Sequence, residues 1–167
     1  MTKTIRNNSN ARNRRHLVSA FILASTMLVV PLGAQAGQCP AGKEGNISIK
    51  DPPSEPVGVV DDVLSQIDLA KQKVDVAGYN FRLRRLTIQP AGVVPFHTHD
   101  ERPALIYIVS GEIVEHSTGC AVPIVHKAGD AAMESVGLSH WWKNMGSEPV
   151  VLTSADIVQD MMVDKMK

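Results

Sequence analysis

Short β-prone runs separated by turn residues fill the chain from residue 79 to residue 158, and this pattern limits the folds open to it. The runs are rich in Val, Ile, Thr and aromatic residues, and Gly, Pro or Asp interrupts the chain between them. Helix-period patterns are few, and the sequence has no internal repeat. Strands are expected at 79–88, 93–99, 104–109, 113–116, 122–126, 131–134, 140–144 and 150–158. The pattern predicts an antiparallel all-β sandwich or barrel.

Two segments are less clear from their patterns. Residues 57–69 fit either one or two helical turns, from the spacing of their Val and Ile residues, or a strand, from the alternation at their end. In the next run Phe81 and Leu83 alternate with two arginines, and the apolar positions then shift to Leu86 and Ile88. We interpret this shift of phase as a β-bulge, followed by a turn at 89–92.

The first 36 residues have the features of an export signal. Basic residues without any acidic residue precede an apolar stretch at 17–32, and Ala34-Gln35-Ala36 offers the small residues that a signal peptidase reads. The apolar stretch is short for a membrane span, so we expect cleavage after Ala36 rather than a retained anchor. Arg14-Arg15 leaves twin-arginine export open beside the Sec route. A periplasmic or secreted protein is predicted.

The net charge of zero conceals an acidic mature chain. Five of the 17 Lys and Arg residues lie in the leader, which leaves 12 of them against 17 Asp and Glu, a net charge of −5. A nucleic-acid partner requires a basic face, so we expect none. We expect no membrane partner after signal cleavage either. The expected partner is a small-molecule ligand or substrate, and a homodimer is left open.

Both cysteines, Cys39 and Cys120, lie in the exported part of the chain. An oxidising compartment permits a disulfide between them, and two unpaired thiols are the alternative. A catalytic thiol is disfavoured because no neighbouring motif would activate either cysteine. We predict the disulfide.

Three histidines give the clearest chemical signal. His97 and His99 are two residues apart in an expected strand, so both imidazoles face the same side. His140 lies in a later strand. Three imidazoles brought together would form a metal site, and histidines that only hydrogen-bond inside the barrel are the alternative.

These histidines fall into two ordered motifs that resemble those of small single-domain cupins. The first motif, whose leading spacer is one residue shorter than usual, matches Gly92, His97, His99 and Gly111. The second, with Ser135 where the family has proline, matches Gly129, Gly137, His140 and Asn144. The resemblance implies a cupin double-stranded β-helix (a jelly-roll barrel) at 57–167, preceded by the signal peptide at 1–36 and an N-terminal arm at 37–56.

One departure from the family concerns the acidic ligand. The family's metal-binding glutamate falls on Ala104, which cannot coordinate a metal. The resemblance therefore implies a three-histidine site unless another carboxylate becomes the fourth ligand. Glu101 and Glu134 are the candidates, and Pro103 argues against Glu101 because it suggests a turn there.

Imidazole ligands suit a divalent transition metal such as Fe, Zn, Ni, Cu or Co. Some cupin dioxygenases likewise use three histidines, so the resemblance implies an oxidoreductase of the Fe-dependent dioxygenase type acting on a small organic substrate. A non-catalytic module that binds a metal or a small ligand is one alternative, and a metal-dependent lyase or isomerase is another. The fold alone does not choose between them.

The roles and positions of several side chains near the motifs are also predicted, some of them with an alternative. Arg102 either holds a carboxylate at the barrel mouth or pairs with an acidic neighbour at the surface, and Arg102 and Glu134 are the candidates for orienting a substrate. One residue of the pair Trp141-Trp142 is expected to face the interior. His116 and His126 have no motif around them, so solvent-exposed positions are expected for both.

Overall fold

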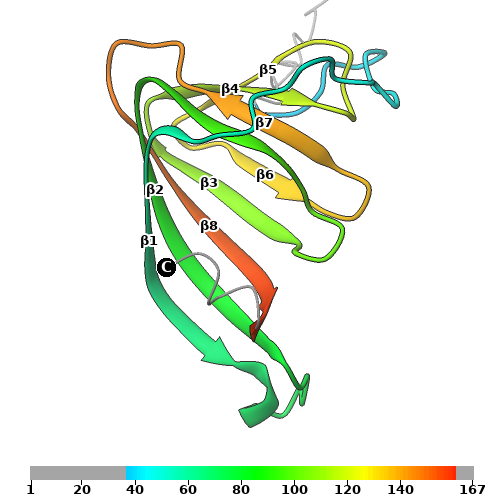
Figure 1. The fold of residues 1–167 in the computed structure, drawn as a ribbon, viewed down its shortest axis with the longest axis vertical. Helices are drawn as coiled ribbons and strands as arrows, with labels where there is room; N and C mark the ends of the chain where they lie inside the picture. The colour runs from blue at the N-terminus through cyan, green and yellow to red at the C-terminus, as the bar shows by residue number, and fades with distance from the viewer. Residues whose placement is uncertain (1–36, 161–167) are drawn as a thin grey trace, which may run out of the picture. The chain divides into compact units, whose positions relative to one another are not determined.

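Antiparallel β-strands make up most of the computed structural model, which describes residues 37–160 (Figure 1). The predicted signal peptide lies outside the described residues. The strands are β1 (Val57–Asp68), β2 (Tyr79–Thr98), β3 (Ala104–Ser110), β4 (Glu112–Ser117), β5 (Ile124–Lys127), β6 (Ala131–Glu134), β7 (Ser139–Lys143) and β8 (Val150–Gln159). A short 3-10 helix, η1 (Leu69–Lys71), follows β1. The all-β prediction is confirmed, and 57–68 form a strand.

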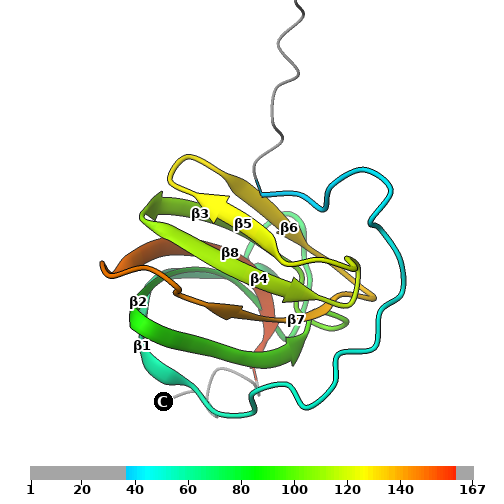
Figure 2. The same ribbon diagram turned by 90° about the horizontal axis from the view of Figure 1, so that it is seen from above.

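The strands form one sheet in the order β5-β4-β7-β2-β8-β3-β6, and β1 lies along β2. Viewed from above, the sheet curves round a central interior to form a barrel (Figure 2). No helix within residues 37–160 is long and apolar enough to cross a membrane.

Strand β2 is the longest and belongs to two parts of the barrel. Its first part pairs with β8 from Tyr79 to Ile88, and its last part pairs with β7 from Val93 to Thr98. Between them a Cβ at Gly92 would lie only 2.6 Å from the carbonyl oxygen of Gln89. The expected turn at 89–92 is therefore a sharp bend within β2, and position 92 requires glycine.

The side chains of β2 do not follow the expected pattern. Arg82 and Arg84 are buried, whereas Phe81 and Leu83 face outwards. The predicted bulge at 85–88 is wrong, because β2 pairs with β8 through this region without a register shift. Inward and outward positions alternate strictly here. The sequence pattern led to the wrong expectation because charged side chains are rarely buried without partners.

The barrel interior has an apolar part and a polar part on the same two strands. Facing pairs of β2 and β8 are Ile88 with Val150 and Leu86 with Leu152, followed by the polar pairs Arg84 with Ser154 and Arg82 with Asp156. The apolar pairs join the hydrophobic core with Ile106, Ile108, Ile113 and Trp142. The polar pairs lie where a hydrophobic core would otherwise continue.

The N-terminal segment 37–56 is joined to the barrel by the predicted disulfide. Cys39 and Cys120 are bonded, with their Cα atoms 5.6 Å apart, and this prediction is confirmed. Backbone hydrogen bonds also hold the segment beyond Cys39. Among them, the N–H of Ile47 donates to the carbonyl oxygen of Thr118 over 2.7 Å, and that of Phe96 donates to the carbonyl oxygen of Pro53 over 2.8 Å. The disulfide closes a loop with a sequence separation of 81 residues.

A double substitution, Cys39→Ser with Cys120→Ser, is expected to lower the free energy of unfolding by about 2–5 kcal/mol, because the unfolded chain then gains the entropy that the long loop removes. Urea unfolding of the oxidised wild type and the double variant measures this difference. A reductant should lower the stability of the wild type alone. Equal stability of the two oxidised proteins would contradict the prediction.

Candidate metal site and adjoining pocket

Four potential metal ligands from three strands meet inside the barrel. They are His97 from the end of β2, His99 directly after that strand, Glu134 from the end of β6 and His140 from β7. Their ligand atoms all lie within 4.8 Å of one another, and each residue except the half-buried His97 is buried. The structure thus brings together the three histidines singled out in the sequence and adds one carboxylate.

The spacing of the ligand atoms fits a single ion. The Nε2 atom of His140 lies 3.1 Å from that of His99 and 3.3 Å from that of His97. The carboxylate oxygens of Glu134 lie 3.0 Å from Nε2 of His99 and 3.3 Å from Nε2 of His140. Two ligands bound at about 2.0–2.1 Å to one ion are themselves about 3.0–3.4 Å apart at octahedral or tetrahedral angles.

The hydrogen bonds of the other ring nitrogens orient all three histidines. Nδ1 of His97 lies 2.8 Å from the carbonyl oxygen of Pro95, and Nδ1 of His99 lies 2.8 Å from that of Arg102. Nδ1 of His140 lies 2.7 Å from the carboxylate of Glu115. The two carbonyl oxygens accept, so Nδ1 of His97 and Nδ1 of His99 carry the hydrogen. Nδ1 of His140 lies between the Glu115 carboxylate and the indole N–H of Trp142, which is 3.1 Å away.

The Nε2 atoms of the three histidines face one another. Burial, helped by repulsion from His140, lowers the pKa of His97 to about 3, and burial lowers the pKa of His99 to about 4. Both rings are therefore neutral at pH 7, with lone pairs directed at a common point beside a carboxylate. A bound cation would satisfy this arrangement, so the donor set fits a metal ion.

Strand pairing explains how a carboxylate reaches the cluster although Ala104 occupies the usual position. Ala104 of β3 is the register partner of Glu134 of β6. Both residues face the interior and are 4% exposed. The carboxylate is therefore carried by the neighbouring strand at the same level of the barrel. Glu101, the other candidate, is exposed and lies outside the cluster.

The affinity for zinc is expected to fall about tenfold for each pH unit below pH 7 and to level off above it. Burial raises the pKa of Glu134 to about 7, so below this pH an ion must displace the carboxyl proton. His97 and His99 are already deprotonated above pH 5 and add no further dependence there. Competition titrations between pH 5.5 and 8 measure the slope. Glu134→Gln should remove it, and a flat profile for the wild type would contradict the assignment.

Behind His140 lies a buried carboxylate that the sequence did not reveal. Glu115 accepts a hydrogen bond of 2.7 Å from His140 and another of 2.7 Å from Nε2 of His126. Burial would raise the pKa of Glu115, but these two hydrogen bonds outweigh it and lower the pKa to about 2. An ionised Glu115 orients the His140 ring and increases its basicity as a ligand.

His126 corrects the expectation that it faces solvent. It is fully buried on β5, and its ring stacks on Trp142 with centroids 4.4 Å apart. The one signal in the sequence is the inward-facing position of Glu115, between Ile113 and Ser117 on β4, which places a carboxylate beside His126. His116 is half-buried and stacks on Trp141 instead.

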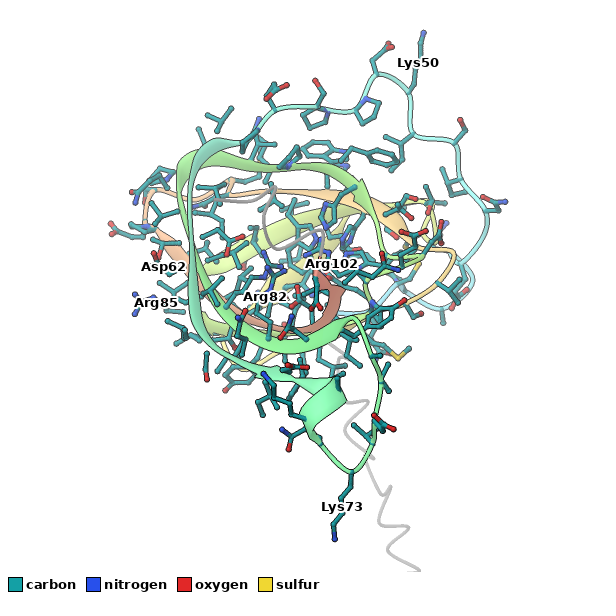
Figure 3. All side chains as sticks on the ribbon, turned by 60° about the horizontal axis from the view of Figure 1, so that its bottom comes forward. Lys50, Asp62, Lys73, Arg82, Arg85 and Arg102 are labelled. Atoms are coloured by element: carbon teal, nitrogen blue, oxygen red, sulfur yellow. A yellow bond between two sulfur atoms is a disulfide. The ribbon has the colours of Figure 1, made fainter. Side chains whose placement is uncertain are left out.

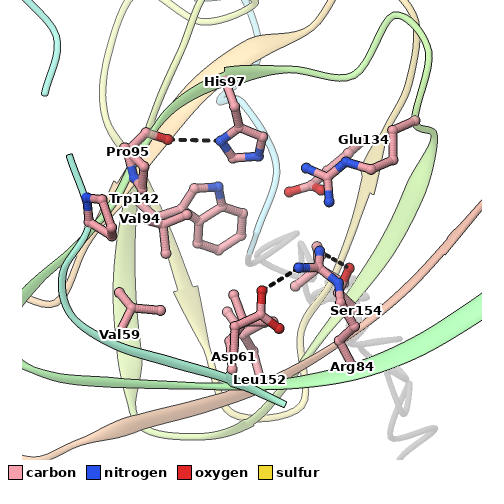
Figure 4. Close-up of a pocket in the computed structure, with 14 residues that line it drawn as sticks. Val59, Asp61, Arg84, Val94, Pro95, His97, Glu134, Trp142, Leu152 and Ser154 are labelled. Carbon is pink, nitrogen blue, oxygen red and sulfur yellow. Dashed lines mark hydrogen bonds and ion pairs between the residues drawn. The ribbon is translucent and has the colours of Figure 1, made fainter. Parts of the chain in front are cut away.

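A cavity of about 450 Å³ adjoins the cluster (Figure 4). His97 and Glu134 line it at one end, and Arg84 and Asp61 line it at the other, as the close-up shows. Its apolar walls are formed by Val59, Leu86, Val94, Ile106, Leu152 and Trp142. Trp142 is thus the tryptophan that faces the interior, 3% exposed.

Arg102 also lines this cavity, in keeping with the first of its two predicted roles. Its guanidinium lies 3.1 Å from the carboxylate of Asp156. The alternative pairing with the adjacent Asp100 or Glu101 does not occur within the described residues. Arg102 therefore belongs to the interior of the barrel.

These features define an all-β barrel protein with a cluster of metal-ligating residue types inside it. The sequence profile of the Cupin_2 family, a cupin domain, matches residues 84–156. The matched segment runs from β2 to β8 and contains both histidine motifs. Residues 84–156 therefore form a Cupin_2 domain of the cupin superfamily, as the motifs predicted.

Similar curated proteins share only part of their length with this chain. Auxin-binding protein ABP19b of Prunus persica is 34% identical over 85 residues, which are 49% of this chain and 41% of that protein. The oxalate-binding protein of Thermotoga maritima is 38% identical over 63 residues, which are 38% of this chain and 50% of that protein. The matches thus span half or less of these relatives.

Among solved structures, a protein from Thermotoga maritima described as a predicted oxalate decarboxylase is similar to this chain. Its TM-score is 0.48 and its sequence identity 21%, over 65% of this chain and 94% of that structure. KdgF from a Halomonas species has a TM-score of 0.49 and 13% identity, over 68% of this chain and 91% of that structure.

Proposed function

We propose that this cupin binds one divalent transition metal ion through His97, His99, Glu134 and His140, and holds a small organic molecule in the adjoining cavity. The observation that carries the proposal is the convergence of three Nε2 atoms, each oriented by a hydrogen bond at Nδ1, on one carboxylate. Auxin-binding and oxalate-binding relatives support a small organic ligand.

Within this proposal the favoured reaction is oxidation of the organic ligand by dioxygen. His97, His99, Glu134 and His140 would hold an iron ion with positions left for other ligands, and the ion would supply a redox centre there. The protein's own contribution is positional: Glu115 orients His140, and the apolar walls exclude water from the cavity. A lyase or isomerase reaction would use the same positions with the ion as a Lewis acid.

A second candidate function is binding without catalysis. The two curated relatives are named for what they bind rather than for a reaction, which favours this candidate. The cavity and the metal ligands would then serve recognition alone.

Metal analysis and oxygen uptake test these functions together. Protein purified from the exported fraction is expected to contain about one transition metal ion per chain, and His97→Ala is expected to contain none. Iron-loaded protein is then given small carboxylic acids, diketones and phenols under air. Substrate-dependent oxygen uptake supports the oxygenase, and tight binding without uptake supports the binding module. Absence of metal from the wild type, even after incubation with each candidate ion, would refute both.

We further propose that the protein is exported and matures by cleavage after Ala36. The Cys39–Cys120 disulfide supports this, because such bonds persist in oxidising compartments. Intact-mass analysis of the exported protein should give a chain that begins at Gly37. A cytosolic, unprocessed and reduced protein would contradict the proposal.

A further inference from the structure

Three arginines, two of them buried, lie close together beside the cavity. Arg82, Arg84 and Arg102 all surround the carboxylate of Asp156. Its Oδ2 atom lies 2.9 Å from Nη2 of Arg82, 3.2 Å from Nη2 of Arg84 and 3.1 Å from Nη1 of Arg102. One carboxylate oxygen therefore faces three guanidinium groups.

The charges in this cluster do not balance. Arg84 has a second ion pair, with Asp61 of β1, so three guanidinium groups share two carboxylates among the residues that the structure describes. Nε of Arg84 is buried and has no hydrogen-bond partner. Burial lowers the pKa of Arg84, and the nearby Asp61 and Asp156 only partly counteract it. Within these ion pairs one positive charge thus lacks a matching anion, and the next carboxylate on the cavity wall is that of Glu134 in the metal-ligand cluster.

Only part of the cluster is accessible to a ligand. Arg82 is 1% exposed, does not line the cavity, and makes a two-point pair with Asp156 that holds this carboxylate in place. Arg84 and Arg102 do line the cavity, beside the apolar walls. Arg82 and Asp156 therefore support the cluster, and Arg84 and Arg102 present donors to the cavity.

We propose that Arg84 and Arg102 form a carboxylate-binding subsite, and that the ligand of this protein is a small monocarboxylate with an apolar body. The carboxylate would supply the missing negative charge, and guanidinium groups bind carboxylates through directed, charge-assisted hydrogen bonds. The apolar body would lie against Leu86, Ile106 and Trp142. The ligand class deepens the proposed function, because the other end of such a ligand would face the metal.

Replacing Asp61 should change the affinity for anions in a direction that distinguishes the proposal from a structural role. Its side chain is 36% exposed, lies on β1 at the margin of the barrel, and pairs with Arg84 where an incoming carboxylate would bind. Asp61 therefore competes with a ligand for the same guanidinium. Removing its charge should strengthen the binding of anions, whereas a purely structural Asp61 would weaken it when replaced.

The same two strands offer a matched control. Asp62 of β1 is the register partner of Arg85 of β2, and the two form an ion pair 3.2 Å long whose side chains are about half exposed. Figure 3 shows Asp62 and Arg85 at the outer surface, whereas Arg82 and Arg102 lie inside the barrel. The outer pair has the same chemistry as the Asp61–Arg84 pair but no access to the cavity.

Calorimetric titrations with phenylacetate, hexanoate and their uncharged amides test the subsite, in zinc-loaded and metal-free protein. We expect each carboxylate to bind at least about tenfold more tightly than its amide. Arg102→Met should remove this difference, Asp61→Asn should tighten carboxylate binding severalfold, and Arg85→Met should change nothing. Thermal melting shows that each variant is folded, and Arg84→Lys provides a second, milder test if Arg102→Met is not.

The outcomes separate this inference from the metal site. Carboxylate binding that survives in metal-free protein and is lost in Arg102→Met supports the subsite, even if no metal binds. Binding that requires zinc and is indifferent to the Arg102 and Asp61 substitutions overturns the subsite and leaves the metal site standing. Equal affinity for acids and amides, or no binding of any probe at millimolar concentration, also overturns it.

Discussion

Replacing Glu134 with alanine is expected to lower the affinity for zinc by about a hundredfold or more, and adding Ala104→Glu to the same chain is expected to restore most of it. The loss follows because the only carboxylate in the ligand cluster disappears. The recovery follows from strand pairing, since residues 104 and 134 are direct partners and both face the interior. Partners of this kind have Cβ atoms about 5 Å apart, within the reach of a glutamate side chain.

Competition with a chromogenic chelator measures the three affinities at pH 8, where the pKa of Glu134, about 7, no longer limits binding. Glu134→Ala with Ala104→Gln is the control, because it restores the volume without the charge. Ala104→Glu alone should not improve binding, since it places two buried carboxylates side by side. Unchanged zinc affinity in Glu134→Ala would show that Glu134 is not a ligand. A double variant as weak as Glu134→Ala would show that a carboxylate at position 104 does not reach the ion.

Asp156→Asn is expected to lower the free energy of unfolding by about 3–5 kcal/mol, because breaking a buried ion pair leaves an uncompensated charge. Here one carboxylate serves three arginines, and its side chain is fully buried. The hydrogen bonds from Arg82 and the charges of the other two arginines outweigh burial and keep the pKa of Asp156 below its usual value. Asparagine has a similar shape but cannot balance their charges.

Urea unfolding of Asp156→Asn and Asp62→Asn provides the comparison. Asp62 pairs with Arg85 at the surface, where such a pair contributes under about 1 kcal/mol. Adding Arg82→Met to Asp156→Asn should recover part of the lost free energy of unfolding, because it removes one of the unpaired buried charges. A small effect of Asp156→Asn, equal to that of Asp62→Asn, would mean that the cluster contributes little to stability.

The fold and the three histidines could be predicted because their signals are local. The alternation of strand residues places His97 and His99 on one face, and the fixed spacing of the second motif leads to His140. Glu134 was one of two candidates, and choosing between them required the β3–β6 register, which depends on contacts between distant segments. Local patterns do not contain that information.

The polar interior shows the same limit more clearly. Arg82 and Arg84 alternate with Phe81 and Leu83, so the sequence pattern predicts that Phe81 and Leu83 are buried, whereas it is the arginines that are buried. The arginines are tolerated inside because Asp156, more than 70 residues later, lies opposite them on β8. The burial of His126 likewise requires its hydrogen bond to Glu115 across the β4–β5 pair. The residues next to His126 in the sequence do not indicate this partner.

The disulfide between Cys39 and Cys120 has a consequence for limited proteolysis. Its loop contains the whole of β1 and β2, including the exposed residues 72–78 between η1 and β2. A single cut there would leave the two fragments covalently joined. Electrophoresis of the nicked protein should therefore show one full-size band without reductant and two shorter bands with it.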